Sequence, residues 1–97
     1  MDSLVAPLIA KLKENHPDSR LDVVEQAYEI AKVAHLGQLR KSGEEYITHP
    51  VAVSEILAEL GLTDTTIIAS LLHDTAEDTS YGLARLKIDF GPEIADL

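Results

Sequence analysis

The sequence has no cysteine, no long apolar run and few positive charges. The absence of cysteine excludes disulfides and thiolate zinc sites, and it fits the reducing cytoplasm. No run of about 18 or more apolar residues is present, so we expect no membrane partner, and the first residues are unlike a signal peptide. Eight basic residues against 17 acidic ones give a formal net charge of −9, which argues against a general nucleic-acid-binding surface.

Apolar residues recur at helical spacing along nearly the whole chain, without the alternation of strands or an internal repeat. The 97 residues therefore predict one small all-α domain. The predicted helices cover approximately residues 3–14, 19–36, 49–60 and 64–73, followed by a short helix capped by Thr79 or Ser80 and a last one that opens at Pro92. The apolar residues expected in the core include Leu4, Val5, Leu8, Ile9, Leu12, Val24, Ala27, Tyr28, Ala31, Ala34, Val53, Ile56, Leu57, Leu60, Ile67, Ile68, Leu71, Leu72, Leu83, Leu86 and Phe90.

Two histidines are predicted to meet at one end of a helical hairpin. His49-Pro50 is typical of a helix start and Gly61 of a helix end, and the next helix begins near Asp64. A turn this short makes the two helices antiparallel neighbours. At roughly 1.5 Å per residue, the chain runs about 16 Å away from His49 and about 14 Å back to His73, so both histidines return to the same level.

The segment from His73 to Asp78 places one imidazole and three carboxylates within six residues, directly after an apolar helical run. Buried charge without a partner is costly, and a bound cation would offset that cost. Imidazole and carboxylate ligands suit Mn2+, Fe2+ or Zn2+ rather than Ca2+. Geometry alone leaves open that His49 and His73 are ordinary helix-end histidines. Adjacent residues of a helix point about 100° apart, so His73 and Asp74 are not a chelating pair by position alone.

Two acidic residues, Glu77 and Asp78, follow His73 and Asp74 by one helical turn, so we expect them to face the same opening. A carboxylate placed there can accept a proton from water or orient a ligand. The alternative is a solvated acidic helix end, in which Asp78 helps to cap the next helix.

Two of the eight basic residues are adjacent, at Arg40-Lys41, in a polar loop predicted between residues 38 and 48. An arginine can stack on a purine or bind phosphate through two nitrogens, and a lysine offers a point charge. On their own, these two residues are more typical of a solvated loop.

Three sequence blocks together resemble the N-terminal hydrolase domain of the RelA/SpoT family, the bacterial enzymes that make and destroy the alarmone ppGpp. The blocks run from Ala34 to Gly43, from Tyr46 to Pro50 and from Leu72 to Thr79, within a match that covers about residues 27–97. That domain belongs to the HD superfamily of metal-dependent phosphohydrolases. The resemblance implies an HD-type helical bundle, represented here by its N-terminal five to six helices.

The resemblance also implies a metal centre and a catalytic pair. His49, His73 and Asp74 match the family's metal ligands, usually for one Mn2+ ion. Glu77 and Asp78 match the acidic pair that orients or activates the attacking water. The family's fourth metal ligand is an aspartate some tens of residues after the His-Asp pair, and these 97 residues do not contain it.

The implied substrate is a guanine nucleotide, ppGpp or pppGpp. Arg40, Lys41 and Ser42 match the family's nucleotide-binding loop, and the implied reaction converts ppGpp to GDP and pyrophosphate. One alternative is an HD phosphohydrolase that acts on another nucleotide. Another is a decayed HD domain that is kept for regulation in a ppGpp synthetase, also called a GTP pyrophosphokinase.

The sequence stops five residues after Pro92, and an isolated helix needs on the order of 12 residues. We therefore expect residues 1–97 to be the N-terminal part of an HD hydrolase domain, without a synthetase domain. The remaining helices of such a domain would cover part of the face formed by Ile67, Ile68, Leu71 and Leu72. Without them we expect that part of the face to be exposed, and exposed apolar patches tend to bind partners. We expect these 97 residues to bind metal weakly or not at all, to hydrolyse ppGpp negligibly and to self-associate, for example by exchange of the terminal helix.

Overall fold

The computed structural model of the chain describes residues 4–78 and 81–95, except for the side chains of Glu77, Asp78 and Leu83. Within these ranges the chain forms six helices, which are α1 (Ala6–Asn15), α2 (Leu21–Ala34), α3 (Thr48–Glu59), α4 (Asp64–Asp78), α5 (Gly82–Phe90) and α6 (Pro92–Ala95). The all-α prediction is therefore confirmed, whereas the predicted caps at Thr79 or Ser80 lie outside the described residues. Nowhere in the described ranges is a helix both long and apolar enough to cross a membrane.

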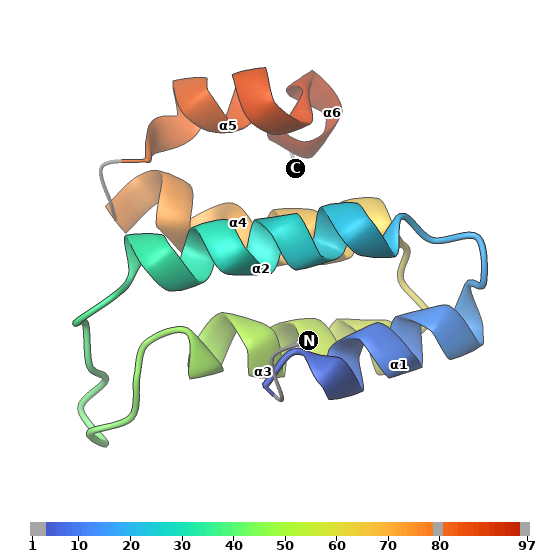
Figure 1. Cartoon of the computed structure of the whole chain (residues 1–97), viewed down its shortest axis with the longest axis horizontal. Coiled ribbons are helices and arrows are strands. Elements are labelled where there is room, and N and C mark those ends of the chain that lie inside the picture. Colours follow the sequence, from blue (N-terminus) through green and yellow to red (C-terminus); the bar gives the residue numbers. More distant parts are fainter. Residues whose placement is uncertain (1–3, 79–80, 96–97) are drawn as a thin grey trace.

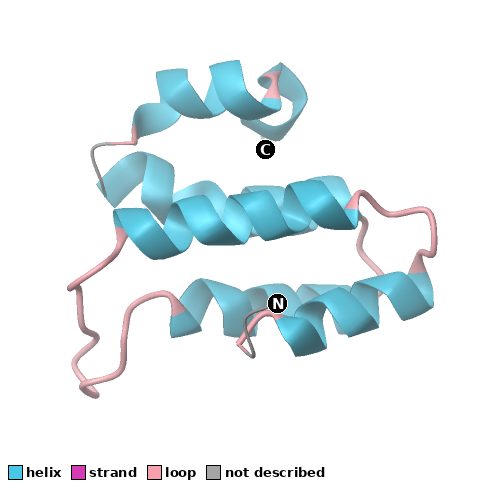
Figure 2. Cartoon of the chain, in the orientation of Figure 1, coloured by secondary structure: helices cyan, strands magenta, loops and turns pink. Residues whose placement is uncertain are grey.

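The helices lie in three tiers in the view of Figure 1, with α1 and α3 below, α2 and α4 in the middle, and α5 and α6 above. Helix α4 is central, because it packs against α2, α3, α5 and α6. The connecting segments cross over at the two ends of the bundle, and the longest described one joins α2 to α3 (Figure 2). This arrangement surrounds one helix with apolar neighbours and leaves its ends for polar contacts.

The core is built mainly from the predicted apolar faces of α1, α2 and α4. Each of these helices repeats apolar residues every three or four positions, so that one face is apolar along its length. The buried hydrophobic residues of these three helices and of α5 and α6 are Leu8, Ile9, Leu12, Val24, Ala27, Tyr28, Ala31, Ile67, Ile68, Leu71, Leu72, Leu86 and Ile94. Full burial of a leucine or isoleucine side chain stabilises a fold by about 1.5–3 kcal/mol, so this face dominates stability.

The apolar face of α4 was expected to stay partly exposed in this piece, and that prediction is wrong. Ile67, Ile68, Leu71 and Leu72 are at most 1% exposed. The reason is that α2, α3 and α5 pack around α4 and cover the face from within the 97 residues. This face therefore offers no exposed apolar patch for self-association.

The apolar face predicted for α3 is also wrong. Val53, Ile56 and Leu60 are 37%, 58% and 72% exposed, and Leu57 is half-buried. The residues that α3 buries instead are Pro50, Val51, Ser54 and Ala58. This helix carries apolar residues on two sides, and its packing against α1 and α4 decides which side is buried. Ser54 Oγ donates a hydrogen bond to Ser70 Oγ of α4 at 3.1 Å.

The beginning of α4 is fixed by a pair of charged residues. The backbone N–H and the Nε–H of Arg20 both donate to Asp64 Oδ2 at 2.9 Å, and the backbone N–H of Thr65 donates to Asp64 Oδ1 at 2.8 Å. The hydrogen bond from the Arg20 side chain holds the pKa of the Asp64 carboxyl below its ordinary value. The segment that enters α2 is thereby tied to the first turn of α4.

The last helix is a single turn that packs against the bundle. Pro92 opens α6, as predicted, and Ile94 is buried against the core. A helix of four residues does not hold by itself in water, so this turn depends on its tertiary contacts.

Candidate metal and nucleotide site

The predicted site residues gather at one end of the bundle. The end of α2, the loop that follows it, the beginning of α3 and the end of α4 all lie at the left of Figure 1. His49 lies in the first turn of α3, and α4 continues as a helix past His73 to Asp78. The hairpin of α3 and α4 therefore brings the two histidines to the same end, as the similar lengths of the two predicted helices indicated.

A pocket of about 250 Å3 lies between the beginning of α3 and the end of α4. The residues that line it are His49, Pro50, Val53, Ser70, His73 and Asp74. His73 is exposed, whereas His49 and Asp74 are half-buried. All three predicted metal ligands thus reach one pocket, although His73 and Asp74 are neighbours on a helix. Val53, which was expected in the core, forms part of its wall.

The donor set of this pocket has the right chemistry for a metal, but it is not a formed centre. Two imidazoles and a carboxylate make a mixed nitrogen and oxygen site that suits Mn2+, Fe2+ or Zn2+. Within the part of the chain that the structure describes, no three histidines or acids converge closely enough to hold an ion. The side chains of Glu77 and Asp78, the predicted catalytic pair, lie outside the described residues.

The three predicted nucleotide-binding residues lie together on the loop between α2 and α3. The backbone N–H of Arg40 donates to Glu44 O at 2.8 Å, and that of Gly43 donates back to Arg40 O at 2.8 Å. Gly43 has a φ of +90°, which favours glycine at this turn. The turn holds open a pocket of about 600 Å3, whose lining residues are Leu39, Arg40, Lys41, Ser42 and Tyr46.

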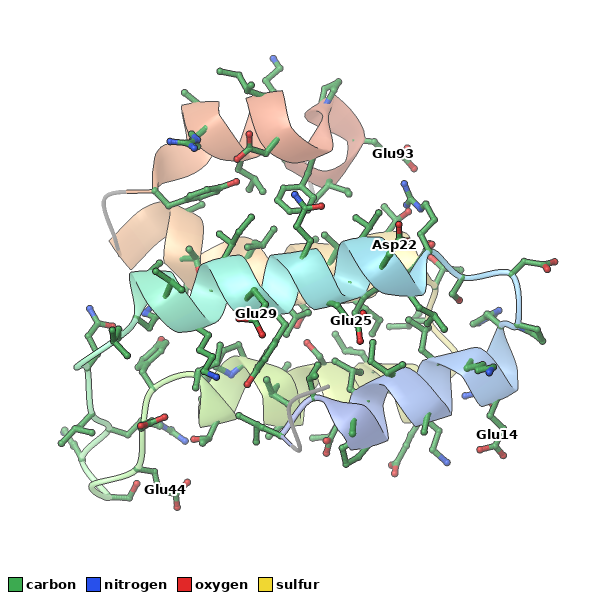
Figure 3. The ribbon with its side chains drawn as sticks, in the orientation of Figure 1. Glu14, Asp22, Glu25, Glu29, Glu44 and Glu93 are labelled. Carbon is green, nitrogen blue, oxygen red and sulfur yellow. The ribbon has the colours of Figure 1, made fainter. Side chains whose placement is uncertain are left out.

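The charge around the loop pocket contrasts with that of the rest of the chain. Figure 3 labels six acidic side chains that extend from α1, α2, α6 and the loop itself, where Glu44 stands. Of these acids only Glu44 belongs to the loop that carries Arg40 and Lys41, and both cations are exposed. Two adjacent cations can attract phosphate over a short range even when the net charge is −9, because salt screens the more distant acids beyond roughly 8–10 Å.

Tyr46 joins the two pockets. Its ring lines the loop pocket, and its hydroxyl donates a hydrogen bond of 2.6 Å to Oδ2 of Asp74, which lines the other pocket. The ring also meets the His49 ring edge-on, with 6.2 Å between the centroids. Tyr46 belongs to one of the three blocks that carry the family resemblance, and no role was predicted for it.

Comparison with known proteins places this arrangement in a family. Residues 27–97 match the HD domain family, and this range contains both pockets. The chain belongs to the HD-domain family.

Curated relatives of this HD domain carry names from ppGpp metabolism. A probable GTP pyrophosphokinase of Mycobacterium leprae is 51% identical over 97% of this chain. A bifunctional (p)ppGpp synthase/hydrolase RelA of Mycobacterium tuberculosis is 53% identical over 80% of it, and a bifunctional (p)ppGpp synthase/hydrolase SpoT of Escherichia coli is 48% identical over 84%. The chain spans only 11–12% of the length of these relatives, so its resemblance to the RelA/SpoT family concerns one region of much longer proteins.

His35, for which no role was predicted, contacts both Tyr46 and helix α4. His35 is buried, and its ring stacks on Tyr46 at 4.5 Å between centroids. Its Nδ1 lies 2.7 Å from Gln38 Oε1 and its Nε2 lies 3.1 Å from Thr75 Oγ1. Each ring nitrogen of His35 therefore has a hydrogen-bond neighbour. The contact with Thr75 could not be predicted from the sequence, because Thr75 is 40 residues away along the chain.

Proposed function

We propose that this chain forms part of a metal-dependent pyrophosphohydrolase site that acts on ppGpp or pppGpp. The observation that carries the proposal is the convergence of His49, His73 and Asp74 on one pocket, joined through Tyr46 to the Arg40–Ser42 loop. The names of two of the relatives include (p)ppGpp hydrolase, which supports this choice among the HD-domain reactions.

The loop would bind the nucleotide. Arg40 can stack on the guanine or bind a phosphate through two nitrogens, and Lys41 offers a compact positive charge for a second phosphate. The Ser42 hydroxyl can donate one hydrogen bond to an anionic oxygen. These groups line one pocket of about 600 Å3, which lies within the size range of small-molecule sites.

The other pocket would hold the ion. His49, His73 and Asp74 would provide its protein ligands, and an ion bound there would polarise the phosphoryl oxygens and make a water easier to deprotonate. The family resemblance adds a fourth ligand that these residues lack. We therefore propose weak binding of Mn2+ by the 97-residue chain, because fewer ligands leave more positions to water.

The reaction needs one proton acceptor. The oxygen of water attacks the ribose-proximal phosphorus of the 3′-pyrophosphate, the bond from that phosphorus to the ribose 3′ oxygen breaks, and the 3′ oxygen gains the proton that the attacking water gives up. For ppGpp the products are GDP and pyrophosphate. Glu77 and Asp78 follow the pocket residues by one helical turn, so either carboxylate could take the proton of the attacking water. The backbone of both residues belongs to α4, which fixes their position along the helix.

Nucleotide binding provides the direct test of the substrate class. We expect the chain to bind ppGpp in isothermal titration with added Mn2+, and to bind AMP and ATP at least about tenfold more weakly. Arg40→Ala should abolish this difference, because the loop contacts are lost, and Lys87→Ala on the outer face of α5 is the matched control. Equal affinity for all three nucleotides would favour an HD phosphohydrolase of another substrate and contradict the proposal.

Product analysis provides the test of the reaction. We expect negligible conversion of ppGpp to GDP and pyrophosphate by the 97-residue chain with Mn2+, measured by anion-exchange chromatography. In a longer protein that contains this region, Glu77→Gln and Asp78→Asn should lower kcat while ppGpp still binds, which is the pattern of a lost transition-state interaction. A rise in KM with unchanged kcat would place the pair in binding instead. Rapid turnover by the 97 residues alone would refute the need for a further ligand.

A further inference from the structure

The hydroxyl of Tyr46 connects the loop pocket, which Arg40, Lys41 and Ser42 line, with the proposed ion pocket, which His49, His73 and Asp74 line. Its hydrogen bond to Asp74 Oδ2 is 2.6 Å long, which is typical of a neutral hydroxyl that donates to a charged carboxylate. Such bonds are roughly twice as strong as those between neutral groups. The hydroxyl therefore restrains the rotation of the Asp74 side chain.

Tyr46 is itself held by contacts at both ends of the loop. Its backbone N–H donates to Gln38 O at 3.0 Å, and its ring stacks on the buried ring of His35. The His35 ring in turn contacts Gln38 on one side and Thr75 on the other. The two ends of the loop are thus attached to Asp74 and Thr75, which are adjacent residues of α4.

This network has a consequence for Asp74. A carboxylate that accepts one hydrogen bond from a hydroxyl retains lone pairs on both oxygens for a cation. Movement of the loop carries the Tyr46 hydroxyl with it and so changes the orientation that the carboxylate prefers. Any ligand that orders the loop then changes the affinity of the neighbouring pocket for an ion, and the effect is reciprocal.

We propose that Tyr46 is a positioning residue that couples the Arg40–Ser42 loop to Asp74. Occupation of the loop pocket by a guanine nucleotide and occupation of the other pocket by a divalent ion favour each other through its hydroxyl. The proposal rests on the proposed function for the identity of these two ligands. The coupling of the loop to α4 rests on the contacts of Tyr46 and His35 alone.

The first test removes only the hydroxyl. Tyr46→Phe should weaken Mn2+ binding about tenfold, measured by electron paramagnetic resonance of free Mn2+, because outer partners of metal ligands contribute on this scale. The matched control is Tyr81→Phe, which removes a hydroxyl that donates to Asp89 Oδ2 at 2.7 Å, away from both pockets. We expect Tyr81→Phe to leave the Mn2+ affinity within twofold of the original. Equal Mn2+ affinity in Tyr46→Phe and the original chain would overturn the proposal and leave the proposed function standing.

The second test asks whether Tyr46 acts through Asp74. In a double-mutant cycle, Tyr46→Phe should weaken Mn2+ binding in the original chain and have no further effect in Asp74→Asn. A tyrosine with a merely structural role would lower the melting temperature in both backgrounds and add its effect to that of Asp74→Asn. Additive effects on Mn2+ affinity would therefore overturn the proposal.

The third test measures the coupling between the ligands. GDP should raise the Mn2+ affinity of the original chain and of Tyr81→Phe by at least about fivefold, within the usual range of coupling energies. GDP should leave the affinity of Tyr46→Phe unchanged. The same GDP effect in all three proteins would show that the nucleotide acts by another route, and the proposal would fail.

The last test needs neither ligand. In the ligand-free chain, Tyr46→Phe should shift the side-chain carboxyl resonance of Asp74 and speed hydrogen exchange of the Arg40 and Tyr46 amides several-fold, and Tyr81→Phe should do neither. If the original chain binds no Mn2+ but these changes occur, the proposed function fails while the coupling of the loop to α4 stands. If the resonance and the exchange rates are unchanged, the coupling fails whatever the metal result.

Discussion

The two ends of α4 each carry a hydrogen-bonded aspartate, yet the two carboxylates differ in their partners. Asp64 at the beginning of the helix accepts hydrogen bonds from the charged Arg20 side chain and from two backbone N–H groups. Asp74 near the other end accepts one from the neutral hydroxyl of Tyr46, and it stands beside His73 and lines a pocket with His49. One carboxylate is neutralised by a cation of the chain, and the other keeps a charge that a ligand can meet.

The difference shows how one helix separates a structural role from a binding role. The helix N-terminus favours negative charge, so Asp64 is stabilised there even before Arg20 is considered. Near the C-terminus the helix dipole has the opposite sign and disfavours a carboxylate, so Asp74 and the acids after it stand where an external cation is most useful. Stability and ligand binding should therefore respond to different substitutions.

The largest expected effect is on the proposed ion site at the end of α4. His73→Ala should reduce the Mn2+ affinity of the chain more than about 100-fold, since loss of a direct ligand exceeds the loss of an outer partner. Because His73 is exposed, the free energy of unfolding should change by no more than about 0.5 kcal/mol. Titration with Mn2+ and urea unfolding measure the two quantities. A folded His73→Ala protein with unchanged Mn2+ affinity would remove the metal assignment.

The Asp64→Ala substitution tests the beginning of α4. Asp64→Ala should lower the free energy of unfolding by about 1–2 kcal/mol, because the helix loses an N-terminal partner and Arg20 loses its ion pair. The Mn2+ affinity should stay within twofold of the original, because both groups lie at the far end of α4. Urea unfolding measures the free energy of unfolding, and Mn2+ titration of the same sample measures the affinity. A large fall in Mn2+ affinity would show that the two ends are not independent.

The pH dependence of stability sharpens the comparison. The Arg20 side chain lowers the pKa of Asp64 in the folded state, so this contribution to stability is complete above the unfolded value of about 3.9. It is lost as the pH falls through the lower, folded pKa. Between pH 5 and about pH 2, Asp64→Asn and Arg20→Gln should therefore lose less stability than the original chain. Equal losses in all three proteins would mean that the pair contributes nothing to acid unfolding.

The smallest expected effect concerns the apolar residues that α3 leaves exposed. Ile56→Glu should change the free energy of unfolding by no more than about 0.5 kcal/mol, because the side chain is already 58% exposed. Ile68→Ala on the buried face of α4 is the contrasting control and should cost about 2–5 kcal/mol. Self-association of the chain stays a prediction, and sedimentation of both variants tests it. If Ile56→Glu destabilises the monomer as much as Ile68→Ala, the assigned faces are wrong.

Much of the architecture followed from local patterns. The helix periods, the helix start at His49-Pro50, the stop at Gly61 and the short turn before Asp64 predicted an antiparallel hairpin with His49 and His73 at one end. These signals act over a few residues and depend on backbone conformation, so they can be recognised without knowledge of the rest of the chain. The apolar face of α3 could not be predicted in this way, because apolar residues occur on two of its sides.

The sequence by itself determined the helices, the order of the chemical groups along them and the resemblance to the RelA/SpoT family. Only the tertiary structure decided that α3 buries Ser54 and Ala58 and leaves Ile56 and Leu60 exposed, because α3 packs between α1 and α4 and its neighbours select the buried side. It also decided that Tyr46 donates to Asp74 and stacks on His35, contacts that join residues 28 and 11 positions apart. Such contacts depend on how separate helices and a loop pack together, and periodicity within one element carries no information about them.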